Sequence, residues 1–492
     1  MKLSDLIKND EYVRLSGELS REVTGITTDP EYRGNANLLI IIKNGTNIGP
    51  KDLDARFSAI ICDDGTFDAL SLECECTLIS VSSPRRALAM AESRIREIDY
   101  SRMKFVAVTG TNGKTTTARL VRAMLGAGGY KTAFIGTGAI EIGSTRLTDD
   151  FYSMTTPDPT LLYEAIKQME SAGVDYVVME VSSHALFFEK VAPITFSCSI
   201  FTNISAEHLD FHKTLKDYTE TKLKLLSSSE LAIMNIDDPV LRSVYDGVGI
   251  RKKSFGILWG GDSHATDLID RGFGGFKFIY RESSFSFLAT SPLAGKFNLY
   301  NALGALSAAI ALGVAPRIAK EALLRFSGVK GRIECVYDGK IKAIIDYAHS
   351  EEAFRALLST ARSYTKGRLI ALFGCGGDRY SGKRSVMAKI AEKYADKVYV
   401  TADNPRKESP ESIFSDIISG FSKESCYTLI PDRAEAIAAM IDDSKDGDTL
   451  LFIGKGAEEY NIDAEGYHRF DERGIILAAI KRKEDESDES QP

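Results

Sequence analysis

The sequence has no long hydrophobic run and no signal-like N-terminus. No apolar stretch approaches the roughly 20 residues that a helix needs to cross a bilayer. The N-terminus, Met-Lys-Leu-Ser-Asp-Leu-Ile-Lys-Asn-Asp, lacks the apolar core of a secretory signal. We therefore expect a cytoplasmic protein that is not inserted in a membrane.

Paired cysteine spacing and an excess of positive charge are also missing. The seven cysteines are odd in number and scattered, and Cys74 and Cys76 are too close together for a zinc knuckle. We expect all of them to be reduced thiols. The formal net charge of −8 argues against nonspecific nucleic-acid binding as the main role, although a small anionic substrate could occupy a local basic pocket.

What the sequence does contain is typical of a protein with several globular domains. Its 492 residues correspond to about three domains of roughly 150 residues each. We expect a mixed α/β N-terminal domain over residues 1–100, a central mononucleotide-binding domain with a parallel sheet over 101–331, and a C-terminal Rossmann-like α/β domain over 332–480. Residues 481–492 are polar and charged, and we expect a disordered tail there.

Short apolar runs alternate with helical patterns along the chain. Strands are expected at 38–42, 57–62, 105–109, 131–135, 176–180, 198–201, 231–235, 343–346, 369–373, 397–401 and 449–453. Helices are expected at 84–100 and 302–312, and residues 250–294 resemble a β-rich insertion or an edge hairpin. This alternation predicts parallel sheets with helices on both faces.

The most informative run follows the first strand of the central region. Val106-Ala-Val-Thr-Gly110-Thr-Asn-Gly113-Lys114-Thr115-Thr116-Thr117 reads as a buried strand, a glycine turn and the start of a helix. Such a turn points backbone N–H groups at one place, which suits a polyphosphate, while Lys114 adds charge and Thr115 a hydroxyl for Mg²⁺. The usual Gly-x-x-x-x-Gly-Lys-Thr pattern would need glycine at Val108. An ordinary strand-to-helix turn is the alternative to a nucleotide-binding turn.

Polar residues follow the next strands of the central region. Glu180 ends an apolar strand, and a carboxylate facing the phosphate turn is a natural Mg²⁺ ligand unless it only caps the following turn. Four of the six histidines, His184, His208, His212 and His349, come just after expected strands, which favours a site over chance packing. On the helix after His208, the pattern does not distinguish Lys222 from Lys224.

Four polar clusters close expected strands in the C-terminal region. They are Asp346-Tyr-Ala-His349, Gly374-Cys-Gly-Gly-Asp378-Arg379, Asp403-Asn404-Pro405-Arg406 and Gly454-Lys-Gly-Ala-Glu458. In the third cluster, proline fixes the turn and arginine offers a planar fork for a carboxylate, although Asp-Asn-Pro is also an everyday turn. Four such clusters at one sheet edge predict a pocket for an amino acid or another carboxylate.

Taken in order, these motifs resemble the Mur ligase family of peptidoglycan synthesis over nearly the whole chain. The matching runs are Thr109-Gly-Thr-Asn-Gly-Lys-Thr-Thr116, Thr155-Thr-Pro-Asp158, Glu180-Val-Ser-Ser-His-Ala-Leu186, Thr202-Asn-Ile-Ser205, His208-Leu-Asp-Phe-His212, Phe297-Asn-Leu-Tyr-Asn301 and Asp346-Tyr-Ala-His349. Together they are similar to the family members that add the third amino acid to UDP-N-acetylmuramoyl-L-alanyl-D-glutamate. Asp403-Asn-Pro-Arg406 is similar to the motif of members that add meso-2,6-diaminopimelate, and a lysine-adding member is expected to lack that arginine.

The resemblance implies an ATP-dependent amide ligation. ATP would phosphorylate the free carboxyl of the D-glutamate unit, and the incoming amine would attack the acyl phosphate, because resonance makes a carboxylate a poor electrophile. The implied cofactors are ATP and Mg²⁺, with a carbamylated lysine at Lys222. The implied partners are the UDP-N-acetylmuramoyl dipeptide and a diamino acid. We expect no nucleic-acid partner and a monomeric protein.

The resemblance also implies a role for individual residues. The implied catalytic residues are Lys114, Lys222 and His208, and the implied magnesium ligands are Thr115, Glu180, His208 and carbamylated Lys222. Nucleotide contacts are implied at Gly110, Thr111, Asn112, Gly113, Lys114, Thr115, Thr116, Asn298, Asn301, Asp346 and His349. Contacts to the UDP-sugar substrate are implied at Thr155, Thr156, Ser182 and Lys190. The pocket for the incoming amino acid is implied at Arg379, Asp403, Asn404, Pro405, Arg406, Gly454 and Glu458.

The chain departs from the family pattern at several positions. Phe188 and Lys190 stand where members usually carry glutamine and arginine, Asp29-Pro-Glu31 replaces Asp-Ser-Arg, and Ala457 replaces histidine. Lysine cannot reproduce the bidentate fork of arginine, although it can serve a phosphate as a point charge.

Three alternatives stay open. The incoming amine could be L-lysine or ornithine. A folylpolyglutamate-type ligase would share the nucleotide turn but should lack the N-terminal domain and the Asp-Asn-Pro-Arg run. A nucleotide-dependent switch would leave Glu180, His208 and Lys222 unexplained.

Overall fold

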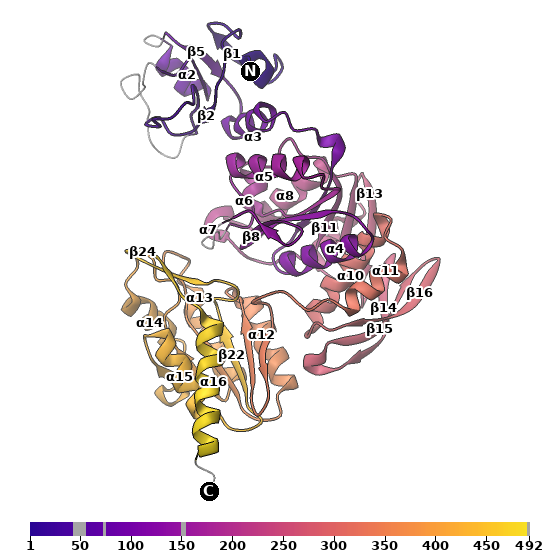
Figure 1. The fold of residues 1–492 in the computed structure, drawn as a ribbon, viewed down its shortest axis with the longest axis vertical. Coiled ribbons are helices and arrows are strands. Elements are labelled where there is room, and N and C mark those ends of the chain that lie inside the picture. Colours follow the sequence, from indigo (N-terminus) through magenta and orange to yellow (C-terminus); the bar gives the residue numbers. More distant parts are fainter. Residues whose placement is uncertain (43–55, 72–74, 149–153, 490–492) are drawn as a thin grey trace.

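The chain folds into three α/β bodies, each built around its own sheet. The computed structural model describes residues 1–42, 56–71, 75–148 and 154–489. Its main sheets have five, eleven and six strands and fall in the N-terminal, central and C-terminal regions in turn. Figure 1 shows the three bodies following one another, with the N-terminal body at the top and the C-terminal body at the lower left. The predicted α/β class with parallel sheets is confirmed, while the predicted domain boundaries remain predictions.

The N-terminal sheet has the order β1-β5-β4-β3-β2, with β1 antiparallel to β5 and the other pairs parallel. Its elements are α1 (Leu3–Leu6), β1 (Arg14–Ser16), β2 (Ile26–Thr27), β3 (Leu38–Ile40), β4 (Ala59–Cys62), α2 (Asp64–Leu70), β5 (Thr77–Ser80) and α3 (Pro84–Ile95). The helix predicted over 84–100 ends earlier, at Ile95, because Glu97 turns the chain into the left-handed region with φ of 51°. A 3₁₀ turn, Tyr100–Arg102, then leads into the central body.

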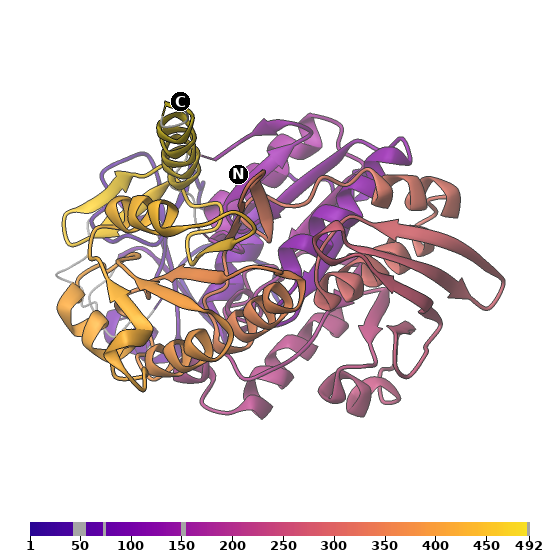
Figure 2. The same ribbon diagram turned by 90° about the horizontal axis from the view of Figure 1, so that it is seen from below.

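The central sheet has the order β16-β15-β14-β13-β12-β11-β6-β10-β7-β8-β9. Its strands are β6 (Lys104–Thr109), β7 (Thr132–Gly136), β8 (Ala139–Ile142), β9 (Thr145–Arg146), β10 (Tyr176–Glu180), β11 (Phe196–Phe201), β12 (Leu231–Asn235), β13 (Arg251–Gly256), β14 (Ser263–Asp270), β15 (Phe276–Glu282) and β16 (Phe285–Ser291). Neighbouring strands from β14 to β7 are parallel, and antiparallel pairs extend the sheet at both edges. The β-rich segment predicted at 250–294 is therefore confirmed as an edge of this sheet. Figure 2 shows β14–β16 projecting at the side opposite the C-terminal body.

Helices cover both faces of the central sheet because its strands alternate their apolar side chains. Val106 and Val108 of β6 pack in one core with α4 and α10, whereas Phe105 and Ala107 pack in the other with α5. The helices are α4 (Lys114–Ala127), α5 (Pro159–Ser171), α6 (Ser183–Phe187), α7 (Leu209–His212), α8 (Leu215–Leu223), α9 (Pro239–Tyr245), α10 (Lys296–Ala311) and α11 (Pro316–Leu324). Both faces being buried explains why the central strands are almost uninterrupted apolar runs.

The C-terminal sheet has the order β17-β18-β22-β19-β20-β21, with only β17 antiparallel to its neighbour. Its elements are β17 (Glu334–Asp338), β18 (Lys342–Asp346), α12 (Glu351–Tyr364), β19 (Leu369–Phe373), α13 (Lys383–Tyr394), β20 (Lys397–Val400), α14 (Pro410–Ile418), β21 (Tyr427–Leu429), α15 (Arg433–Asp443), β22 (Thr449–Ile453) and α16 (Glu472–Glu489). A separate ribbon pairs β23 (Tyr460–Asp463) with β24 (Gly466–Arg469). All four strands predicted in this region are present.

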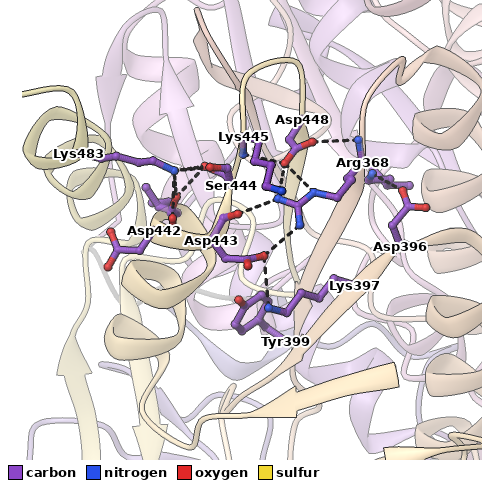
Figure 3. Close-up of polar contacts among 12 residues, drawn as sticks. Arg368, Asp396, Lys397, Tyr399, Asp442, Asp443, Ser444, Lys445, Asp448 and Lys483 are labelled. Carbon is purple, nitrogen blue, oxygen red and sulfur yellow. Dashed lines mark hydrogen bonds and ion pairs between the residues drawn. The ribbon is translucent and has the colours of Figure 1, made fainter. Parts of the chain in front are cut away.

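The disordered tail predicted from residue 481 is wrong as far as Glu489, because α16 continues through it. Ile476 and Ile480 bury their side chains in the core shared with α15. Lys483 donates hydrogen bonds from Nζ to the carbonyls of Ile441 at 2.7 Å and Asp442 at 3.2 Å, and Figure 3 shows it reaching the end of α15. The Ile441 carbonyl also accepts from the Ser444 N–H at 3.1 Å and from Ser444 Oγ at 2.6 Å, so the lysine adds to the capping of this helix end. The charged composition gave no sign of this docking.

Two further expectations concern thiols and membranes. Five cysteines are free, as expected: Cys62, Cys198, Cys335, Cys375 and Cys426. Cys76 instead takes part in a disulfide, which the scattered spacing did not indicate, and Cys74 lies outside the described residues.

Over the described ranges, no helix combines the length and the apolar character that a membrane crossing requires.

Candidate active site

The predicted phosphate turn is the loop between β6 and α4, and its two glycines are sterically required. Gly110 has φ of 144° and Gly113 φ of 85°, both in the region that favours glycine. A Cβ on Gly110 would come within 2.0 Å of Thr202 Oγ1, and one on Gly113 within 2.3 Å of Asn301 Oδ1. The missing first glycine is explained, because Val108 is a buried residue inside β6.

Neighbouring loops hold the turn in place. The backbone N–H of Asn112 donates to Asn203 Oδ1 at 2.9 Å, and the Thr111 N–H donates to the Asn203 carbonyl at 2.8 Å. Thr202 donates from Oγ1 to the Asn112 carbonyl at 2.6 Å. The loop after β11 therefore fixes the loop after β6. Thr116, which follows in α4, is buried.

Two lysines converge on one carbonyl of the turn. Lys114 and Lys222 each donate from Nζ to the Gly110 carbonyl at 2.9 Å, and Lys114 also donates to the Thr111 carbonyl at 2.7 Å. Burial, together with the neighbouring Lys114 cation, lowers the pKa of Lys222 well below its usual value. Lys222 is 1% exposed, whereas Lys224 is exposed, so the structure separates two lysines that the sequence pattern did not.

A buried carboxylate lies against the start of α4. Glu180 Oε2 accepts a hydrogen bond from Thr115 Oγ1 at 3.0 Å, and Oε1 accepts one from the Thr137 N–H at 2.9 Å. Thr137 also donates from Oγ1 to Glu180 at 3.3 Å. A hydroxyl beside a carboxylate fits Mg²⁺, which binds few protein oxygens and keeps waters or substrate phosphates as its other ligands.

The other predicted magnesium ligands are not gathered with this pair. His208 has φ of 55°, is 43% exposed in its side chain, and packs edge-on against His184 with ring centres 5.1 Å apart. Among the described residues, no group of three or more histidine, cysteine or acidic side chains could hold a metal ion. Thr115 and Glu180 are thus the predicted ligands that the structure brings into contact.

The histidines after strands divide into two groups. His184, His208 and His212 share one aromatic cluster with Phe211, and His212 exchanges a hydrogen bond of 3.0 Å with Ser183 Oγ. His349 lies apart, with Nδ1 3.0 Å from the Tyr347 carbonyl. Clustering at strand ends therefore identified three neighbours, of which His212 is a packed and buried side chain.

The predicted nucleotide residues outside the turn come from α10 and the end of β18. Asn301 accepts from Thr117 Oγ1 at 3.3 Å and donates to Asn298 Oδ1 at 2.9 Å, and both asparagines are buried. Asp346 accepts from the N–H groups of Ile333 at 2.7 Å and Ala348 at 2.7 Å. Burial raises the pKa of Asp346.

The residues predicted to contact the UDP-sugar substrate lie beside Glu180. Thr156 donates from Oγ1 to the Glu180 carbonyl at 2.9 Å and accepts from the Ser182 N–H at 3.1 Å. Thr155 exchanges a hydrogen bond of 3.0 Å with Thr137. Lys190 instead pairs with Asp158, with Nζ and Oδ1 2.5 Å apart.

The predicted amino-acid pocket centres on Asn404. Its Nδ2 donates to Glu458 Oε2 at 2.8 Å, and its Oδ1 accepts from Lys455 Nζ at 3.0 Å. Arg406 has φ of 57° and donates from Nη1 to the Gly377 carbonyl at 2.9 Å. Gly454 leaves room for a neighbouring carboxylate, because a Cβ there would come within 2.7 Å of Asp403 Oδ2.

The other two predicted pocket residues, Pro405 and Arg379, have no side-chain hydrogen bond to Asp403, Asn404 or Glu458 among the contacts described above. Pro405 accepts at its carbonyl from the Glu408 N–H at 3.1 Å, and it lies close to Gly377. Arg379 lies on an exposed loop. The structure therefore gathers Asp403, Asn404 and Glu458 tightly, and leaves Arg379 at the rim.

Two carboxyls of this pocket differ in their electrostatics. Burial and the nearby Asp403 raise the pKa of Glu458 to about 7. Burial would raise the pKa of Asp403 as well, but Lys455, Arg433 and Arg406 outweigh it and lower that pKa. Asp403 Oδ1 is buried without a hydrogen bond, and its ion-pair partner Lys455 Nζ lies 3.6 Å away, so it keeps the capacity to accept a hydrogen bond from a ligand.

A cavity joins the two halves of the site. It has a volume of about 480 Å³, and its walls include Thr115 and Thr137 from the central body and Tyr347 and Glu458 from the C-terminal body. Its basic lining residues are Arg119, Arg122, Arg146, Lys330 and Arg332. The magnesium-type pair and the amino-acid pocket thus open into one space.

Several of these residues escaped the sequence reasoning. Thr137 and Arg332 stand in no motif that the sequence analysis recognised. Burial would raise the pKa of Glu207, but the charges of Lys114, His349, His208 and Lys222 outweigh it and lower that pKa. Its place next to His208 in Asn203-Ile-Ser-Ala-Glu-His208 was the one available signal.

Comparison with known proteins agrees with this geometry. The Mur ligase middle domain matches residues 108–309, and the Mur ligase, glutamate ligase domain matches residues 331–456. A UDP-N-acetylmuramoyl-L-alanyl-D-glutamate--2,6-diaminopimelate ligase of Clostridium botulinum is 35% identical over 489 residues, covering 98% of this chain and 100% of that protein. A ligase of the same name from Syntrophomonas wolfei is 37% identical over 497 residues, with coverage of 98% and 100%.

A solved structure extends the similarity to the fold. It carries the same ligase name and superposes with a TM-score of 0.67 at 26% identity. The superposition covers 98% of this chain and 99% of that chain. The similarity therefore covers both the sequence and the fold. The chain belongs to the Mur ligase family.

Proposed function

We propose that the chain is an ATP-dependent ligase that adds meso-2,6-diaminopimelate to UDP-N-acetylmuramoyl-L-alanyl-D-glutamate in peptidoglycan synthesis. The observation that carries the proposal is the shared cavity, whose walls include Thr115 beside the phosphate turn and Glu458 of the amino-acid pocket. A ligase needs this arrangement because an activated carboxyl and an attacking amine must meet away from water.

The first step is activation of the D-glutamate carboxyl. A carboxylate oxygen attacks the terminal phosphorus of ATP, ADP leaves, and an acyl phosphate forms. Lys114 and the backbone N–H groups of the turn would stabilise the charge on the transferring phosphoryl group. Thr115 and Glu180 would hold Mg²⁺, which neutralises the phosphate oxygens when bound.

Lys222 is suited to carbamylation. A neutral lysine amine attacks carbon dioxide and loses a proton, so that a cation becomes a carboxylate. Burial and the neighbouring Lys114 cation lower its pKa well below the usual value, which shifts the equilibrium towards the neutral amine. The resulting anion would stand beside Lys114, which shares the Gly110 carbonyl with Lys222. His208 is proposed to complete the metal site on the strength of the family resemblance.

The second step joins the amine to the acyl phosphate. The amine attacks the acyl carbon, phosphate leaves, and the amide forms. Asp403, whose Oδ1 has Lys455 as an ion-pair partner at 3.6 Å but no hydrogen bond, is proposed to pair with an ammonium group of the diamino acid. Glu458, with a pKa of about 7, is proposed to do the same in its carboxylate form. Arg406 and Arg379 are proposed to hold its carboxylates. Thr155, Thr156, Ser182 and Lys190 are proposed to hold the UDP-sugar part.

The choice of amine rests on Asp403-Asn-Pro-Arg406 and on the names of the relatives. L-lysine and ornithine lack the second carboxylate that Arg406 is proposed to bind. The purified protein is given ATP, Mg²⁺, the UDP-muramoyl dipeptide and one amine at a time, and phosphate release is measured. We expect release with diaminopimelate. If none of the amines stimulates phosphate release, the ligase proposal is wrong. If lysine stimulates release and diaminopimelate does not, the assigned amine is wrong.

The setting of the reaction follows from its substrates. ATP and a UDP-linked sugar are both intracellular nucleotides, which supports action in the cytoplasm. We propose that the protein acts as a monomer, because its own central and C-terminal bodies line the shared cavity, and without nucleic acid, which the net charge of −8 disfavours.

A further inference from the structure

The single tryptophan of the chain is unusually exposed. Trp259 has 65% of its surface accessible, and the adjacent Leu258 has 68%. Both lie in the turn that follows β13. Large apolar side chains side by side on a surface commonly mark a ligand or partner site.

This turn is held rigidly. Asp237 accepts hydrogen bonds from the N–H groups of Ile257 at 2.7 Å, Leu258 at 2.8 Å and Trp259 at 2.9 Å. Tyr300 donates to the same carboxylate at 2.8 Å. Burial would raise the pKa of Asp237, but these donors outweigh it and lower that pKa, so the carboxylate stays charged. The indole is therefore presented by a fixed turn and not by a loose loop.

One side of the indole is already occupied by a cation. The guanidinium carbon of Arg242 lies 4.5 Å from the ring centre, and Arg242 is anchored by a hydrogen bond of 3.1 Å to the Ile236 carbonyl. The guanidinium orients the ring. The large exposed surface that remains belongs to a flat aromatic side chain, which suits stacking with another ring.

The turn lies at the same sheet edge as the phosphate turn. The strands β13, β12, β11 and β6 are parallel neighbours, so the loops after them share one edge. Three strand spacings place the two turns about 14 Å apart along that edge. This separation suits a nucleoside triphosphate laid along the edge, with its phosphates at the β6 turn.

On the other side of β6 along this edge lie residues already assigned to the magnesium site and the shared cavity. Glu180 ends β10 and Thr137 follows β7, both on the other side of β6, and Thr137 lines the cavity shared with the amino-acid pocket. Helix α10 connects the two turns instead. Its Asn301 lies against Gly113, and the adjacent Tyr300 holds Asp237. The nucleoside end of ATP is thereby directed towards β13.

We propose that Trp259 is the stacking surface for the adenine ring of ATP, with Leu258 as its apolar neighbour. The inference rests on the proposed function only in taking a nucleotide to occupy the phosphate turn. It assigns to this chain a base-binding residue that lies in none of the motifs recognised in the sequence.

Because Trp259 is the single tryptophan, the unmodified protein reports on it directly. ADP and inorganic tripolyphosphate are titrated separately while tryptophan emission is recorded, and calorimetry gives each dissociation constant. We expect ADP to change the emission and tripolyphosphate to bind without the same change. Trp259→Ala should weaken ADP binding about fivefold or more, as loss of base stacking does, and Trp259→Phe should retain most of it.

Controls separate this inference from the proposed function. Leu288→Ala removes an equally exposed side chain, 55% accessible, on the outermost strand β16 and should leave both constants unchanged. Tripolyphosphate binding should be the same in Trp259→Ala as in the unmodified protein. If ADP binds the unmodified protein and Trp259→Ala equally well, the stacking inference is wrong while the ligase proposal stands. If neither ADP nor tripolyphosphate binds the unmodified protein, the ligase proposal fails and takes the inference with it.

Discussion

The buried Lys222 is the most informative residue of the site. Lys222 is 1% exposed and donates to the Gly110 carbonyl, and its ammonium form is disfavoured by burial and by Lys114. A neutral amine reacts with carbon dioxide, whereas an ammonium does not. Lys114 destabilises the ammonium form of Lys222, but it would attract the negatively charged carbamate form. Burial thus favours the chemistry that turns this cation into an anion.

Replacement of Lys222 tests this residue directly. We expect Lys222→Ala to reduce kcat about 10- to 100-fold, the scale on which loss of a group that supports a metal site reduces activity. Activity of the unmodified protein should fall on removal of bicarbonate and return when it is restored. Lys224→Ala is the matched control, because Lys224 is exposed on the same chain segment. Equal losses in both variants, or no response to bicarbonate, would contradict the carbamate.

The acid of the amino-acid pocket gives a second prediction at this scale. Glu458 has a pKa of about 7, so it is neutral below that pH and charged above it. Since only the carboxylate attracts an ammonium group, kcat/KM for the diamino acid should rise as the pH passes upward through about 7. Glu458→Gln should remove this inflection and leave KM for ATP unchanged. An inflection that persists in Glu458→Gln would assign the titration to another group.

Among the elements, the strand-to-helix unit β6–α4 was the easiest to predict. An apolar run followed by Gly110 and Gly113 indicates both the strand end and the turn. The C-terminal part of α16 was missed because its stability comes from contacts that are distant in sequence, such as Lys483 with the end of α15. Composition describes a segment in isolation, and this segment is ordered by its neighbour.

The phosphate turn provides a prediction for an element. Gly113→Ala would place a Cβ within 2.3 Å of Asn301 Oδ1 on a residue with φ of 85°. The turn must shift to relieve this, so we expect KM for ATP to rise about tenfold or more, in keeping with the cost of a left-handed alanine and the added contact. KM for the diamino acid should change little.

A second glycine supplies the control for that experiment. Gly126 lies inside α4, and a Cβ there would meet only Thr132 Oγ1, at 3.8 Å. Gly126→Ala should leave KM for ATP unchanged and raise the melting temperature, because alanine is favoured over glycine in a helix by about 0.5–1 kcal/mol. A similar KM for ATP in Gly113→Ala and in the unmodified protein would show that the turn does not bind the nucleotide.

For the whole molecule, local patterns predicted the sheets but not how the bodies meet. Alternating apolar runs were enough for the parallel cores, and the strand ends placed the clusters of polar residues. Thr137 and Arg332 both line the shared cavity, and neither residue belongs to a recognised motif. Assembly of the cavity from the central and C-terminal regions is a tertiary property, so sequence spacing could not assign these residues.

One contact links the C-terminal body to the phosphate turn. Glu352, at the start of α12, accepts from Asn112 Nδ2 at 3.3 Å and from the Ser205 hydroxyl. The contact links the two bodies beside the phosphate turn. We expect this carboxylate to oppose a bound polyphosphate by like charge.

Removing that charge should make ATP binding easier. We expect Glu352→Gln to lower KM for ATP about two- to fivefold, the scale of one like-charge interaction near a protein surface. Glu351→Gln, which neutralises the preceding residue, should have no such effect. Small-angle scattering should show a change in the radius of gyration on addition of a non-hydrolysable ATP analogue, because bringing the two bodies onto the nucleotide requires them to move. If Glu352→Gln instead weakens ATP binding, the like-charge prediction is wrong. Glu352 and its contacts with Asn112 and Ser205 would then support nucleotide binding.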